Sequence, residues 1–204
     1  MPGRGPVAGE PVRYATAARG LLRDTIVDSV DALARSRGWA ATTMSDVART
    51  AGVSRQTLYN EFGSRHALVE AYVAREIERL VAAASEAVRH HADDAKTALR
   101  EAFALFLRLA SDEPVVKIIV ADTSTEGELL QLLTGVGQAV AGGRIATLIQ
   151  EVWPQVGPAD AQVVAETLVR LAISHALLPV ADPDVVAGDV SRLLAPFVDS
   201  VLGP

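Results

Sequence analysis

The sequence predicts an all-α fold, with a small N-terminal domain followed by a larger helical domain. Half of the 204 residues are hydrophobic and only 4% are aromatic, a mixture typical of helices that pack against helices. Apolar residues recur at steps of three and four, and no segment shows the alternation that indicates a half-buried strand. Gly and Pro residues separate these periodic segments, so we expect a series of helices joined by short breaks.

The composition excludes several kinds of site. The chain has no Cys, which excludes disulfides, thiolate metal ligands and cysteine nucleophiles. Its first residues lack the apolar stretch of a signal peptide, and no run approaches the ~18 apolar residues of a membrane span. We therefore expect a cytoplasmic protein that has no membrane partner.

The net charge of −6 is unevenly distributed along the chain. Residues 1–66 contain nine Arg and six acidic residues, whereas residues 67–204 contain ten basic and nineteen acidic residues. A positive excess in one segment favours contact with a polyanion, although an excess of this size also arises by ordinary scatter.

The N-terminal segment is predicted to be an arm followed by one helix. Residues 1–16 are expected to be flexible, because four of the first six are Pro or Gly and no periodicity follows. From residue 17 to 37, apolar residues share one face of an amphipathic helix, and Gly38 is suited to end it.

Two short helices joined by a glycine turn are predicted next. Thr43 and Asp46, three residues apart, can cap each other reciprocally at the start of a helix that ends near residue 50. Gly52 can adopt the left-handed conformation of a tight turn, and Ser54 can cap a third helix over residues 55–62.

The larger domain is predicted to contain further helices. The first of them is long: it begins after Gly63 and Ser64, runs to about His90 and connects the two domains. Pro residues mark several of the later breaks. The remaining helices are expected over residues 95–111, 114–121, 126–135, 136–152, 158–178 and 184–202.

The third helix has the pattern of a major-groove reader. Leu58 and Phe62, four residues apart, can face inward and leave the opposite side free. Arg, Gln and Asn side chains can bond base edges in the major groove, and hydroxyls at a helix N-terminus suit phosphates. The expected outward residues are Arg55, Gln56, Tyr59 and Asn60 for bases or backbone, with Ser54 and Thr57 for phosphates.

Residues 42–48 (TTMSDVA) and 51–65 (AGVSRQTLYNEFGSR) resemble the DNA-binding domain of the TetR family of regulators, a likeness that covers about residues 19–66. The resemblance implies a helix-turn-helix domain over residues 17–64, in which Thr43 and Tyr59 contact the DNA backbone and Arg65 holds a phosphate. Glu61 departs from the family pattern. It could accept a hydrogen bond from cytosine, but a solvated side chain is the favoured interpretation. Trp39 is expected to pack in the core.

The same resemblance implies that residues 65–204 form an effector-binding and dimerisation domain, with a homodimer built through the last two long helices. Recognition helices of such a dimer would lie about 34 Å apart, so the operator should be roughly palindromic. Apolar residues that could pack in the interface would look the same in an intrachain core. They are Val163, Leu168, Leu171, Val190, Leu194 and Val198.

A lipophilic effector is expected, because the helices after residue 95 offer mainly apolar lining with few charges. Phe103, Phe106, Leu107 and Trp153 are candidate lining residues, together with Leu109, Ile118, Ile119, Leu132 and Leu133. Arg170, Ser174 and His175 could orient a polar head group, or Arg170 could pair with Glu166 while His175 is a core residue. The segment RLAISH (170–175), with QTLYNEFGSR (56–65), is similar to actinobacterial TetR members linked to alkane or fatty-acid metabolism.

Other classes of function fit less well. Adjacent residues of a helix diverge by about 100 degrees, so neither the pair His90–His91 nor Ser174–His175 can readily share one metal or reaction centre. No catalytic motif, metal ligand set or cofactor is therefore expected, and an enzyme is a remote alternative. The function expected is a repressor released from a palindromic operator by a small lipophilic effector. A DNA-binding regulator without an effector is the nearer alternative.

Overall fold

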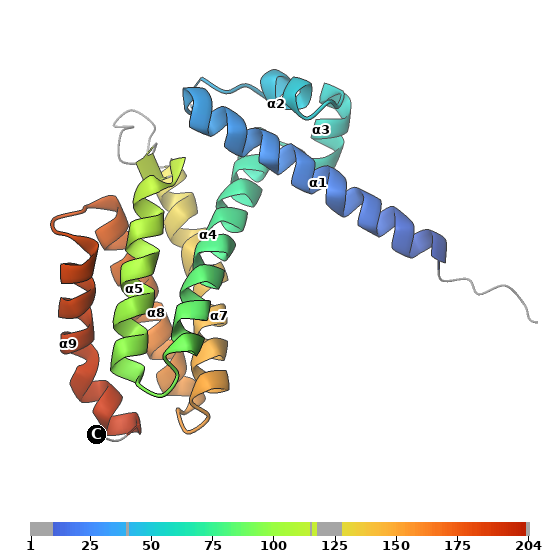
Figure 1. The fold of residues 1–204 in the computed structure, drawn as a ribbon. Coiled ribbons are helices and arrows are strands. Elements are labelled where there is room, and N and C mark those ends of the chain that lie inside the picture. Colours follow the sequence, from blue (N-terminus) through green and yellow to red (C-terminus); the bar gives the residue numbers. More distant parts are fainter. Residues whose placement is uncertain (1–9, 40, 115, 118–127, 203–204) are drawn as a thin grey trace, which may run out of the picture. The chain divides into compact units, whose positions relative to one another are not determined.

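The computed structural model describes residues 10–39, 41–114, 116–117 and 128–202, and over these residues the only regular secondary structure is helical (Figure 1). The chain divides into two compact units, Met1–Val69 and Glu70–Pro204. This division falls inside one long helix, whose first turn belongs to the first unit. The all-α prediction is confirmed.

The first unit contains α1 (Glu10–Arg37), α2 (Met44–Thr50) and α3 (Arg55–Phe62). The expectation that the first helix begins at residue 17 is wrong, because α1 begins at Glu10, while residues 1–9 of the predicted arm lie outside the described residues. Pro11 lies in the first turn, where proline is tolerated, and the Ala-rich segment that follows favours helix even though its side chains are exposed. Arg13 is therefore helical, whereas Arg4 lies outside the described residues.

The core of the first unit is aliphatic and fully excluded from solvent. Each helix contributes to it, and the first turn of α4 (Arg65–His90) completes it. Its largest fully buried hydrophobic residues are Ile26, Val30, Val47, Leu58 and Leu68. Trp39 is also buried, as predicted. Burying each such aliphatic side chain contributes about 1.5–3 kcal/mol to the free energy of unfolding. This burial holds α1, α2 and the first turn of α4 against α3.

The second unit contains the rest of α4, then α5 (Ala95–Asp112), α7 (Glu128–Val152), α8 (Pro158–Leu177) and α9 (Pro183–Leu202). Figure 1 shows α5 beside α9, with α8 packed against both α5 and α7. The expected helix over 114–121 lies mostly outside the described residues. None of the described helices combines the length and the apolarity needed to cross a bilayer.

A predicted break at residues 135 and 136 is wrong, because α7 is continuous from Glu128 to Val152. Glycine ends a helix when it adopts a positive φ, but among the described residues only Gly38, Gly52 and Gly63 do so. Gly135 thus stays within the helix, where it lowers helix propensity without breaking the chain of hydrogen bonds.

Two apolar clusters hold the second unit together. One joins α5, α8 and α9, and Phe103, Leu107 and Val190 are among its buried members. The other joins the C-terminal half of α7 to the start of α8 through Ala146, Val156, Ala161 and Ala165. Polar contacts at the edge also tie α9 to α5, since Ser191 Oγ donates to the Lys96 carbonyl at 3.0 Å and Arg108 pairs with Asp184 at 2.5 Å.

Glycine within α7 generates a test of this packing. Gly143 is exposed, and a Cβ added there would meet no atom within 4 Å, so Gly143→Ala should raise the free energy of unfolding by about 0.5–1 kcal/mol. At Gly137 a Cβ would lie 3.1 Å from Ile173 Cδ1, so Gly137→Ala should gain less. Urea denaturation of both variants measures the difference, and an equal gain at the two positions would contradict the packing described.

Candidate nucleic-acid interface and ligand cavity

The predicted reciprocal cap of α2 is present. Thr43 Oγ1 accepts a hydrogen bond from the Asp46 backbone N–H at 3.2 Å, and the Asp46 carboxylate accepts from the Thr43 N–H at 3.1 Å and hydroxyl at 2.6 Å. Arg37 and Arg49 pair with the same carboxylate. The hydrogen bonds from Thr43, assisted by these two cations, lower the pKa of Asp46 below its ordinary value of 3.8.

The third helix is positioned by its own cap and by the turn before it. Gly52 has a φ of +69°, and Ser54 Oγ accepts from the Thr57 backbone N–H at 3.0 Å while its hydroxyl lies 2.8 Å from that of Thr57. Leu58 and Phe62 are buried against the core, as predicted. The turn and the buried pair together fix which side of α3 faces solvent.

The outward face of α3 carries the four residues predicted to read DNA. Arg55, Gln56, Tyr59 and Asn60 are all exposed, Tyr59 by 39% of its surface. Gln56 Nε2 donates to Asn60 Oδ1 at 2.9 Å, so the two amides lie side by side on this face. Such a face presents both donors and acceptors, which is what recognition of base edges requires.

Glu61 is not solvated, so the favoured interpretation of this residue is wrong. Its side chain is only 14% exposed, and Arg19 Nε lies 2.8 Å from its carboxylate. Arg23 donates to the Glu61 carbonyl at 2.5 Å, and its guanidinium also lies over the Phe62 ring, 4.2 Å from the centroid. Glu61 therefore joins the end of α3 to α1. A partner 42 residues away leaves no local signal in the sequence.

Arg65 contacts the segment that joins α1 to α2. Its guanidinium stacks over the Trp39 ring, 4.1 Å from the centroid, and it donates to the carbonyls of Thr42 and Trp39. These bonds satisfy two carbonyls in that segment and hold the first turn of α4 against it. The phosphate contact implied by the family resemblance stays a prediction for this half-buried residue.

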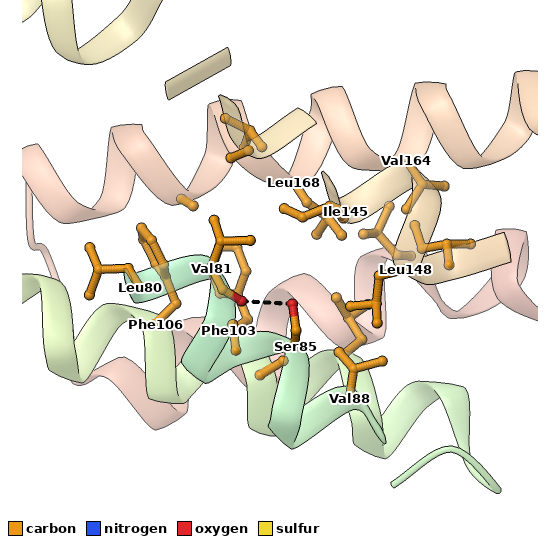
Figure 2. A pocket seen from close by; sticks show the side chains of 18 of the residues that line it. Leu80, Val81, Ser85, Val88, Phe103, Phe106, Ile145, Leu148, Val164 and Leu168 are labelled. Carbon is orange, nitrogen blue, oxygen red and sulfur yellow. Dashed lines mark hydrogen bonds between the residues drawn. The ribbon is translucent and has the colours of Figure 1, made fainter. Parts of the chain in front are cut away.

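The second unit contains an apolar cavity with a volume of about 190 Å³, lined from all five of its described helices. Figure 2 shows side chains of α4, α5, α7 and α8 that surround it. Those labelled are Leu80, Val81, Ser85, Val88, Phe103, Phe106, Ile145, Leu148, Val164 and Leu168. Helix α9 adds Leu194, Phe197, Val198, Val201 and Leu202.

The structure brings together some of the predicted ligand residues and separates others. Phe103, Phe106 and Trp153 line the cavity, whereas Leu107 packs in the adjacent core. Arg170 and Ser174 are exposed on α8, away from this lining. His175 instead meets the edge of Phe103, with ring centroids 6.4 Å apart. Leu109 is half-buried and does not line the cavity. The remaining candidates Ile118, Ile119, Leu132 and Leu133 lie where side chains are not described.

One charged residue borders the cavity and was missed by sequence reasoning. Glu76 of α4 is 4% exposed, and its carboxylate pairs with Arg79 Nε at 3.0 Å and with Arg75 Nε at 3.5 Å. Arg79 also pairs with Glu113, just after α5, which is equally buried. Cross-helix pairing of this kind becomes visible only when α4 and α5 are packed.

Large apolar side chains remain exposed on the two C-terminal helices. Val163 and Leu193 are 61% and 71% exposed, and Leu178 and Val185 are also exposed. Of the six residues considered for a subunit interface, only Val163 is among them. The other five serve the chain's own interior, because each helix turns one apolar face inward.

Within the part of the chain that the structure describes, there is no group of three or more His, Cys, Asp or Glu residues that could hold a metal ion. His90 and His91 meet edge to face with ring centroids 4.8 Å apart at the end of α4.

Comparison with known proteins gives consistent matches over both units. A family model described as bacterial regulatory proteins, tetR family, matches residues 26–72, and one described as the C-terminal domain of the bacterial tetracyclin repressor matches residues 94–196. The chain is 35% identical over 191 residues to the HTH-type transcriptional regulator AlkX of Mycobacterium tuberculosis, which covers 92% of this chain and 90% of that protein.

Two solved structures extend this likeness. The TetR family repressor AlkX from Dietzia sp. strain DQ12-45-1b, implicated in biodegradation of n-alkanes, matches with a TM-score of 0.77 and 33% identity over 87% of this chain and 97% of that chain. RolR in complex with resorcinol matches with a TM-score of 0.66 over 87% and 89% of the two chains. At 16% identity, RolR supports the fold alone.

The cap of α2 generates a pH-dependent test. Because the folded pKa of Asp46 is lowered, its contribution to stability is complete above pH 3.8 and is lost as the pH falls through the lower folded value. Asp46→Asn should therefore lower the thermal midpoint at pH 7 and weaken the acid dependence of stability below about pH 4. Circular dichroism melts measure both. The matched control Asp24→Asn, at an exposed position of α1, should behave like the parent chain, and a similar loss in both variants would refute the role of the cap.

Proposed function

The chain belongs to the TetR family of bacterial transcriptional regulators, and from this premise we propose that it is a repressor that leaves a palindromic operator when a small lipophilic effector binds. The observation that carries the proposal is the exposed face of α3, because a capped two-turn helix there presents Arg55, Gln56, Tyr59 and Asn60 together. The relatives are regulators and not enzymes.

Contacts to DNA are proposed from the chemistry of that face. Arg55 suits a guanine, and Gln56 or Asn60 suits an adenine, because their side chains match the donors and acceptors of those bases. Ser54 and Thr57 stand at the N-terminus of α3, where hydroxyls and backbone N–H groups suit a phosphate. Thr43, Tyr59 and Arg65 are proposed to contact the DNA backbone.

The proposed homodimer uses α8 and α9. Val163, Leu178, Val185 and Leu193 are exposed on or directly after these helices, and pairing them across a two-fold axis would remove apolar surface from water. Two recognition helices related by such an axis would read two half-sites about one turn of DNA apart, which favours a palindromic operator.

Effector control is proposed because the second unit contains an apolar cavity beside its packed clusters. A regulator without an effector has no need of such a space, and an unfilled apolar cavity lowers stability. Helix α4 lines the cavity with Leu80 and Val81, and its first turn holds the α1–α2 segment through Arg65. An effector that changes α4 would shift operator affinity by the coupling typical of allosteric proteins, about 1–3 kcal/mol.

The α3 assignment generates a direct test. Arg55→Ala and Tyr59→Ala should each weaken operator binding by about 1–3 kcal/mol, because each removes a contact to bases or backbone without touching the core. A mobility-shift titration at fixed salt, with the intergenic DNA beside the gene and random competitor DNA, measures the affinity. Arg100→Ala, an exposed Arg of α5, is the control. Unchanged affinity in both α3 variants would remove this helix as the reading element.

The dimer surface can be tested with two leucines that are almost equally exposed. Leu193→Glu on α9 should weaken dimerisation by about 100-fold, because it places two buried carboxylates near each other across the two-fold axis. Leu21→Glu on α1 should leave the dimer intact, although Leu21 is 69% exposed. Sedimentation equilibrium distinguishes the two, and an unaffected Leu193→Glu dimer would place the interface elsewhere.

A further inference from the structure

We propose that the cavity binds an uncharged aliphatic hydrocarbon of about eight carbon atoms, and that it rejects chains of the same size that carry a carboxylate. This inference rests on the proposed effector role of the cavity and adds the chemical class of the ligand. Three features carry it, namely the hydrogen bonds of the polar groups in the lining, the pairing of the charged groups at its edge, and its volume.

The neutral polar side chains of the described lining already donate their hydrogen bonds to carbonyl groups of the protein. Ser85 Oγ donates to the Val81 carbonyl at 2.7 Å, a bond drawn in Figure 2. Trp153 Nε1 donates to the Ala92 carbonyl at 2.9 Å. Every other neutral side chain of the described lining is a hydrocarbon. A ligand head group that needs a donor would therefore find none among the described lining residues, and burying it without one is unfavourable.

The cations beside the cavity are already paired. Glu76 is buried at its edge, Arg75 and Arg79 pair with the Glu76 carboxylate, and Arg79 also pairs with Glu113. No Lys, Arg or His lines the cavity among the described residues. An acid inside would lose its hydration without gaining an ion pair from these residues, which opposes binding.

The volume sets the size of the ligand. A protein cavity of about 150 Å³ lined by aliphatic and aromatic side chains takes up a molecule the size of benzene. A cavity of about 190 Å³ therefore has room for a molecule slightly larger, on the order of eight carbon atoms. Up to that length each added methylene should raise affinity about fourfold, because it buries a further apolar group.

The experiment uses the full chain without DNA. Calorimetry and thermal-shift measurements at pH 7 give its affinity for n-hexane, n-octane and sodium octanoate. We expect n-octane to bind at least tenfold more tightly than n-hexane, and octanoate at least 100-fold more weakly than n-octane. Ala141→Leu, which fills the cavity from α7, should abolish octane binding. Ala139→Leu, two residues away on the exposed side of α7, is the matched control and should bind like the parent chain.

A second variant tests the charge itself. Glu76→Gln should narrow the ratio between octane and octanoate affinity by about tenfold, because Arg75 and Arg79 each lose a partner carboxylate and can then attract the octanoate. Octanoate binding equal to or tighter than octane in the parent chain would overturn the proposal, and so would octane binding that Ala141→Leu does not reduce. Operator binding is measured separately, so a protein that binds its operator but no hydrocarbon would remain a regulator and would refute only this inference.

Discussion

An isolated helix of eight residues is not stable in water, and the whole first unit is built around that constraint on α3. The Ser54 cap and the Gly52 turn fix its start, and Leu58 and Phe62 fix its inner side. Its last turn is held by Arg19 and Arg23 of α1 through Glu61. A helix held at both ends and along one side can present side chains to DNA with little further loss of conformational freedom.

Features encoded within a few residues could be predicted from the sequence. The Thr43–Asp46 cap, the Gly52 turn and the inward Leu58 and Phe62 all depend on neighbours in the chain, and all are present. The beginning of α1 and the continuity of α7 were predicted wrongly. The start of α1 was placed too late because residues 10–16 show no apolar periodicity, and α7 was divided after Gly135, which the helix tolerates.

Features that depend on packing between distant segments could not be predicted from the sequence. The partners of Glu61 lie at least 38 residues away in the sequence, and those of Arg65 at least 23 residues away. Neither pairing therefore leaves a local pattern in the sequence. Phe103, Phe106 and Trp153 do line the cavity, and their contact with a ligand stays a prediction. The outward direction of Arg170 and Ser174 was not predicted. An apolar helix such as α8 does not reveal from sequence which of its sides faces the interior.

In α3, the residues that hold the helix in place differ from those that face solvent, and this separation affects how the protein can change during evolution. The residues that secure the helix, Leu58, Glu61 and Phe62, are separate from the exposed ones at 55, 56, 59 and 60. Substitutions at exposed positions usually alter stability by no more than about 0.5 kcal/mol. Duplicated copies of such a gene could therefore drift to new target sequences while the scaffold stays intact, so that recognition diverges much faster than architecture.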